Sequence, residues 1–318
     1  MLLHAGVADR RMWNAQVDAL VSRRTVVRCD LPGYGGTPVE PGAAGCDAED
    51  VLALLDELGV EGFALVGASY GGYVALQVTS AVPDRVERLV LLDAAADLIE
   101  PDESLREVWR QEQSLVEIGD LAGATDLMVD TWLGPDADDD HRALLRDMQR
   151  RAFDLQVAAG DEGANRDLPV DLARITASVT VVVGHHDLSF FRATARVLAD
   201  GFPHADLVEL AWAGHLPSLE RPAETARGGH GPGMNLWPRR GSRLLVSLLL
   251  GPGLARLGPG ARSVALIAAA HVDRVALIWP ARAGRRQGQE RLKKGLLNSK
   301  QRCPPGSITA VDRVSEDS

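Results

Sequence analysis

The chain has 318 residues, of which 46% are hydrophobic, enough for one large α/β domain or two smaller ones with a sizeable core. Its formal net charge of -10 argues against nucleic acid as a partner, because phosphate binding needs clustered Lys and Arg. The three cysteines are scattered, which argues against a disulfide framework and favours the reducing cytoplasm. We expect no membrane span, because no long apolar run occurs, and no signal peptide, because the chain does not begin with a basic leader.

Apolar runs alternate with amphipathic stretches over the first 225 residues, a pattern typical of βαβ units and a parallel sheet. A helix is predicted at Asp47–Leu58, where apolar residues recur at helical spacing and Gly59 follows as a stop signal. The predicted strands are Thr25–Cys29, Phe63–Val66, Val86–Leu92, Val179–Val183 and Asp206–Leu210.

The second of these strands runs into a Gly-x-Ser-x-Gly turn centred on Ser69. Helical composition follows from Gly72 to Thr79 and ends before Pro83. A serine at a sharp strand-to-helix turn is typical of a nucleophile elbow, in which small residues two positions before and after it let the strand and helix approach closely. Gly67 and Gly71 occupy those positions.

Strand signals are missing between Ala94 and Pro169, where helices are predicted at Leu105–Ile118, Ala122–Trp132 and His141–Ala158. We therefore predict a hydrolase-like core from residues 1–93 and 169–225, with residues 94–168 as a helical cap over an active site. Residues 226–318 differ from the rest, with 16 basic and 5 acidic side chains against 18 and 39 before them. This Gly-, Pro- and Arg-rich segment is a tail of unknown structure, and its altered composition suggests a changed reading frame or a fused segment.

Five ordered motifs resemble the α/β-hydrolase superfamily, in particular small bacterial esterases and enol-lactonase-like enzymes. The resemblance covers residues 1 to about 224 and implies an α/β-hydrolase fold, with a mostly parallel sheet flanked by helices. The motifs are Leu2–Gly6 before Trp13, Asp30–Thr37, the Ser69 elbow, Val181–Asp187, and Gly214-His215 followed by Glu220-Arg221-Pro222.

The family order of nucleophile, acid and base implies Ser69, Asp187 and His215, each following a predicted strand. The imidazole accepts the serine proton, and the carboxylate fixes the imidazole tautomer. Asp93, at the end of the strand Val86–Leu92, is the alternative acid. His185 and His186 are interpreted as loop residues.

The resemblance also implies an oxyanion hole made by the backbone N–H groups of Tyr70 and Gly6. The chain reads His4-Ala5 where the family has His-Gly, so Val7 remains an alternative to Gly6. His4 itself corresponds to a histidine with a structural role. Candidate walls of an apolar pocket are Trp13, Trp109, Met128, Trp132 and Phe153. The alternative is a core position, which large apolar residues on predicted helices occupy more often than a pocket.

These features predict a serine hydrolase of the carboxylic ester hydrolase type that cleaves a small ester or lactone, without a cofactor or metal. A carbon–carbon bond hydrolase or a perhydrolase with the same triad is one alternative. A non-catalytic binding protein of the same fold, or an inactive product, is another. Only Met1–Leu3 precede His4, so the sequence predicts an exposed sheet edge and a weakly anchored oxyanion loop at this position.

Overall fold

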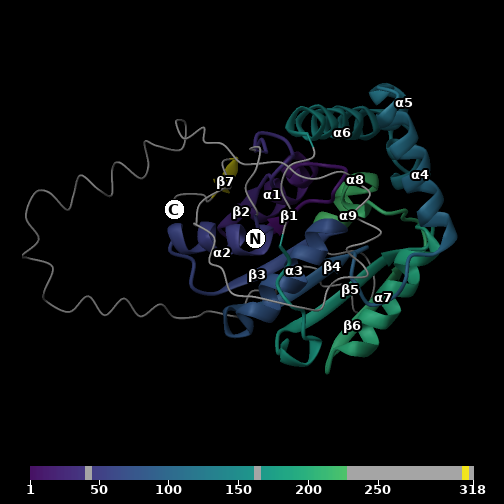
Figure 1. Ribbon diagram of the computed structural model, residues 1–318. Helices are drawn as coiled ribbons and strands as arrows, with labels where there is room; N and C mark the ends of the chain where they lie inside the picture. The colour runs from purple at the N-terminus through teal and green to yellow at the C-terminus, as the bar shows by residue number, and fades with distance from the viewer. Residues whose placement is uncertain (40–44, 161–165, 228–309, 315–318) are drawn as a thin grey trace, which may run out of the picture.

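The computed structural model describes residues 1–39, 45–160, 166–227 and 310–314, and its centre is one seven-stranded sheet (Figure 1). The spatial order of the strands is β6-β5-β4-β3-β1-β2-β7. All neighbours are parallel except β7, which pairs antiparallel with β2. The strands are β1 (Leu2–Leu3), β2 (Val26–Cys29), β3 (Phe63–Ala68), β4 (Val86–Leu92), β5 (Ser178–Gly184), β6 (Ala205–Leu210) and β7 (Val311–Val314).

Every strand predicted from the apolar runs is present, with ends that differ by at most two residues. The central strands are apolar on both faces because helices cover both sides of the sheet. Along β5, Val181 and Val183 point into one core cluster and Val182 into the other. This alternation explains why the run reads as continuously hydrophobic rather than alternating.

Helices form two layers around the sheet. α1 (Asn14–Leu20) contacts α9 (Pro222–Arg227), whereas α2 (Asp47–Glu57) packs on α3 (Tyr70–Ala81). α7 (Ser189–Gly201) packs against β5 and β6. The short α8 (Pro217–Glu220) and the 3₁₀ turns Arg10–Trp13, Pro83–Arg85 and Leu172–Arg174 complete the connections.

Three further helices, α4 (Glu103–Glu117), α5 (Leu121–Trp132) and α6 (Asp139–Ala159), lie between β4 and β5 in the chain, as the sequence predicted. In Figure 1, α5 and α6 lie beyond the sheet, and α4, which precedes them in the chain, lies between α5 and α7. Each helix begins after an aspartate whose carboxylate accepts a backbone N–H of the first turn: Asp102, Asp120 and Asp138. Their apolar residues join the core cluster on one face of the sheet.

The edge of the sheet differs from the sequence prediction. β1 is an internal strand between β3 and β2, so the short segment before His4 is not at an edge. The strand beyond it, β2, is covered by β7 from the far end of the chain. Two parts of the segment 226–318, for which the sequence predicted no structure, are described: Ala226 and Arg227 end α9, and residues 310–314 include β7. Residues 228–309, with Cys303, lie outside the described residues.

None of the helices in the described part of the chain combines the length and apolar character needed to cross a bilayer. Cys29 and Cys46 are both buried free thiols. Burial raises the pKa of Cys46 to about 11, so its thiol is neutral near pH 7.

Candidate active site

Ser69 stands at the sharp turn between β3 and α3 with φ 49° and ψ -115°, a conformation that non-glycine residues rarely adopt. Its backbone N–H donates to the Leu92 carbonyl at 2.9 Å, and its own carbonyl accepts from Ala95 at 3.1 Å. These bonds tie the turn to the end of β4. The surrounding structure thus holds the strained backbone in place, as a nucleophile elbow requires.

The glycines on both sides of Ser69 are required by backbone contacts. A Cβ on Gly67 would lie 2.3 Å from the Gly71 carbonyl oxygen, and a Cβ on Gly71 would lie 2.5 Å from the carbonyl oxygens of Leu3 and His4. Neither neighbour can move without shifting the backbone. The sequence-based reason for the Gly-x-Ser-x-Gly spacing is therefore confirmed: the strand, the helix and β1 approach too closely for a side chain.

Asp187 and His215, predicted from motif order, are brought into direct contact. The His215 Nδ1–H donates to Asp187 Oδ2 at 2.7 Å, and the two residues are only 2% and 8% exposed, respectively. With Nδ1 as the donor, Nε2 of the neutral ring is left as an acceptor. The two residues follow β5 and β6, so the pair lies at the same end of the parallel sheet as Ser69.

The loop that carries His215 is held by Glu220. This buried carboxylate accepts the backbone N–H of Gly214 at 2.7 Å and that of Leu216 at 3.1 Å. Burial raises the pKa of Glu220, while the amide hydrogen bonds oppose that rise. Glu220 was predicted only as part of the last motif, and its positioning role is seen only in these contacts with the His215 loop.

Aromatic rings enclose the His215 imidazole. The Trp132 and Phe191 ring centroids lie 4.5 and 4.3 Å from that of His215. Met128 supports this arrangement, since its sulfur accepts the Trp132 indole N–H at 3.1 Å. Of the predicted pocket residues, Trp132 therefore lies against the base. Phe191 was missed, although it lies in the first turn of α7, four residues after Asp187.

The other predicted pocket residues have different surroundings. Trp13 and Phe153 are completely buried within the core cluster on one face of the sheet. Trp109, on α4, is partly buried and packs against the same cluster. The structure thus gives Trp13 and Phe153 the core positions that the sequence analysis had named as the alternative.

Asp93 lies behind the Asp187–His215 pair. It is fully buried, has φ 46°, and accepts the Gly184 backbone N–H at 2.7 Å. Side-chain atoms of Asp93, Asp187 and His215 all lie within 4.8 Å of one another. Burial, followed by the negative charge of Asp187, raises the pKa of Asp93 well above its usual value. Of the two carboxylates, it is Asp187 that contacts the imidazole, whereas Asp93 contacts the end of β5.

Gly6 and Tyr70, the predicted oxyanion pair, are neighbours. A Cβ on Gly6 would lie 3.3 Å from the Tyr70 Cβ. Tyr70 is the first residue of α3, where a backbone N–H has no acceptor within the helix. Its phenol donates to Asp47 and is directed by that contact toward α2. Val7, the alternative donor, is partly buried against the core.

The remaining histidines have separate roles. His185 and His186 are exposed on the loop after β5, as predicted. His4 is fully buried; its Nε2 accepts the Leu31 N–H at 2.8 Å, which leaves Nδ1 to donate to the Ala5 carbonyl. Burial lowers the pKa of His4, in agreement with this neutral structural role.

Within the described ranges, Ser69 Oγ has no hydrogen bond to another residue, and such bonds often form only when substrate is present.

The profile of the alpha/beta hydrolase family matches residues 1–228. The chain belongs to this family. Among curated relatives, this hydrolase is 25% identical to a 3-oxoadipate enol-lactonase 2 from Acinetobacter baylyi, over 66% of the chain and 79% of the relative. It is 29% identical to a pimeloyl-[acyl-carrier protein] methyl ester esterase from Aeromonas hydrophila, over 70% and 91%. A solved thermophilic esterase from Thermogutta terrifontis aligns with a TM-score of 0.60 and 27% identity, over 71% and 85%.

Proposed function

We propose that this alpha/beta hydrolase cleaves a small carboxylic ester or lactone through an acyl-enzyme on Ser69. The buried His215–Asp187 hydrogen bond is the observation that carries the proposal. It lies at the same end of the sheet as a serine in a strained elbow, and this combination is the arrangement of nucleophilic acyl transfer. The enol-lactonase and the methyl ester esterase among the relatives support an ester or lactone as the substrate class.

In the proposed reaction, His215 Nε2 accepts the Ser69 hydroxyl proton as Oγ attacks the carbonyl carbon. The imidazolium is stabilised by Asp187, which accepts Nδ1–H in both protonation states. Nε2 then donates the proton to the leaving alkoxide as the C–O bond breaks. A water molecule, activated by the same Nε2, hydrolyses the acyl-enzyme and restores Ser69.

The oxyanion that forms at the carbonyl would be bound by the N–H groups of Tyr70 and Gly6. Each preorganised donor of this kind typically lowers the barrier by roughly 3 to 4 kcal/mol. Two features support this assignment: the contact between Gly6 and Tyr70, and the position of Tyr70 at the start of α3, where its N–H has no helical acceptor.

Trp132 and Phe191 would form the wall of the acyl or alcohol pocket next to His215. Their rings contact the imidazole from different elements, α5 and α7, and so present apolar surface beside the base. Met128 would hold Trp132 in place through its sulfur. An apolar wall favours an uncharged, apolar group on one side of the ester.

The test is reaction of the purified full chain with a fluorophosphonate probe, peptide mapping of the label, and turnover of p-nitrophenyl esters, lactones and a diketone. We expect labelling at Ser69 and ester or lactone turnover, both lost in Ser69→Ala. Ser114→Ala, at an exposed serine on α4, is the matched control and should behave as wild type. Folded protein without labelling would contradict the proposal and favour a non-catalytic protein of this fold.

A further inference from the structure

The strand β7 is held against the edge of β2 by contacts that also reach the following loop. The antiparallel register pairs Cys29 with Val311 and Arg28 with Asp312. Just beyond the strands, the Asp30 N–H donates to the Ala310 carbonyl at 2.9 Å. The Ala310 N–H in turn donates to Thr37 Oγ1 at 3.2 Å. β7 and the preceding Ala310 are therefore hydrogen-bonded to β2 and to both ends of the loop formed by residues 30–37.

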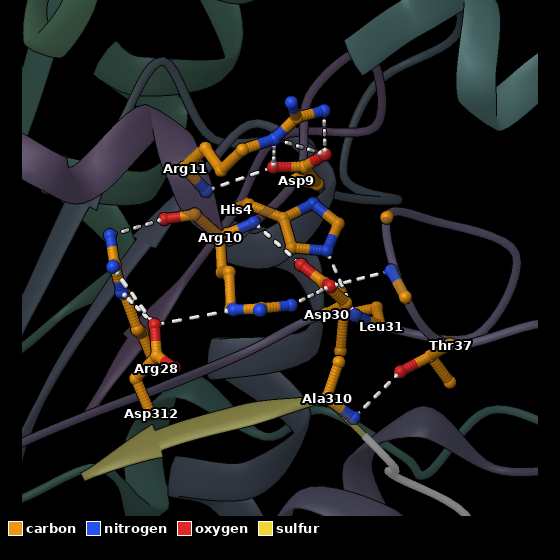
Figure 2. Close-up of polar contacts among 12 residues, drawn as sticks. His4, Asp9, Arg10, Arg11, Arg28, Asp30, Leu31, Thr37, Ala310 and Asp312 are labelled. Carbon is orange, nitrogen blue, oxygen red and sulfur yellow. Dashed lines mark hydrogen bonds and ion pairs between the residues drawn. The ribbon is translucent and has the colours of Figure 1, made fainter. Parts of the chain in front are cut away.

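Asp312 lies between two arginines on this edge (Figure 2). Its Oδ2 accepts Arg28 Nε at 2.9 Å and Arg10 Nε at 3.2 Å. Arg28 also donates to the Arg10 carbonyl at 3.0 Å, so the three residues form one network. The Arg28 side chain is only 13% exposed, which reduces screening of this ion pair by solvent.

The network continues through Arg10 into the fully buried Asp30 carboxylate. Arg10 contacts Asp30 twice, by an ion pair from its guanidinium and by its backbone N–H at 2.8 Å. Asp30 also accepts the Gly36 N–H at 2.8 Å, which closes the loop on itself. Figure 2 shows these contacts as a continuous path from β7 to the loop. Asp312 thus neutralises charge on an arginine that orders residues 30–37.

The loop formed by residues 30–37 packs directly on the oxyanion loop. Leu31 donates its N–H to His4, and the Tyr34 ring contacts the His4 ring edge-on at a centroid distance of 4.9 Å. The Tyr34 hydroxyl lies beside Gly6, where a Cβ would be 3.4 Å from it. A displacement of the loop would therefore be transmitted to the backbone that carries the proposed Gly6 donor.

We propose that Asp312 is a positioning residue that orders the oxyanion loop through Arg10 and Asp30. The inference rests on the proposed function, because it assigns Gly6 to the oxyanion hole. An N–H donor stabilises the transition state only where it is held in place, so loosening it should lower kcat more than substrate binding. The last strand of the sheet would thus contribute to catalysis from the opposite end of the chain.

The experiment compares full-length Asp312→Asn with wild type in ester turnover and thermal unfolding. We expect kcat to fall about tenfold with KM changed less than about twofold, as for partial loss of one oxyanion donor. Asp312→Glu, which retains the carboxylate, should recover most of kcat. Glu209→Gln is the matched control, because it removes an exposed carboxylate paired with Arg196 at 2.8 Å on the opposite edge strand, β6; it should leave kcat unchanged.

Hydrogen exchange of the same proteins gives a readout that does not depend on activity. We expect faster exchange in residues 4–9 and 30–37 of Asp312→Asn, with the central strands unchanged. Unchanged exchange in both loops would overturn the inference, and so would a general increase over the whole sheet, which indicates a merely structural role. If wild type is neither labelled at Ser69 nor active, the proposed function fails, while exchange still decides whether Asp312 orders the loops.

Discussion

Replacing Asp93 with asparagine is expected to remove a pH-dependent loss of stability. Burial and the negative charge of Asp187 raise the pKa of Asp93 well above its usual value in the folded chain. The native state therefore keeps a proton over a pH range in which the unfolded chain has lost it. The free energy of unfolding then falls as pH rises, from the unfolded-state pKa near 3.8 up to the native-state pKa.

The magnitude follows from a single proton. Its linkage slope is about 1.4 kcal/mol per pH unit within that window. Asparagine has the same shape as protonated aspartic acid, so its oxygen can still accept the Gly184 N–H and its amide can face Asp187. Because it has no proton to lose, Asp93→Asn should gain stability over wild type by about 1.4 kcal/mol for each pH unit above about 5, until the native-state pKa is passed.

Urea unfolding of wild type and Asp93→Asn at about pH 5, 6 and 7 measures this difference. Asp18→Asn, at an exposed position on α1, is the control and should track wild type at every pH. A stability difference between Asp93→Asn and wild type that stays the same at the three pH values would refute the reasoning, because it would mean that Asp93 is ionised in the folded chain.

Three further substitutions test the elbow and the base. Gly71→Ala should cost about 3 kcal/mol or more, because its Cβ would stand 2.5 Å from two carbonyl oxygens, whereas Gly119→Ala, at φ 81° but in open space, should cost about 1 kcal/mol; equal costs in urea unfolding would contradict this. Asp187→Asn should lower kcat by about 10³- to 10⁴-fold in ester turnover, because an amide favours the wrong His215 tautomer; a loss below tenfold would argue against the assigned acid. Glu220→Gln should lower kcat by roughly tenfold with KM little changed, since one amide oxygen cannot replace two carboxylate oxygens for two N–H donors; wild-type kcat would exclude the positioning role.

Much of the fold could be predicted from the sequence because its signals are local. Apolar runs gave β3, β4 and β5, and helical spacing with a glycine stop gave α2. The Ser69 elbow was recognisable because it needs small residues at fixed positions within five residues of chain. Local steric and burial requirements of this kind leave a pattern that can be read without knowing what the chain contacts elsewhere.

Contacts between distant segments could not be predicted in the same way. Asp93 and Asp187 each follow a buried strand, so only packing decides that Asp187 contacts His215 and that Asp93 lies behind it. Phe191 and Trp132 carry no local sign that their rings meet at the imidazole. The predicted exposed edge was wrong for the same reason, since β1 lies between β3 and β2. The edge of β2 is covered in turn by β7, about 280 residues later in the chain.

The sequence by itself therefore determined the alternation of strands and helices, the elbow and the order of Ser69, Asp187 and His215. Only the tertiary structure decided which carboxylate bonds the base, which rings enclose it and what covers the edge of β2. The physical reason is that backbone geometry and periodic burial act over a few residues, whereas these choices depend on side chains that meet only after the sheet has assembled.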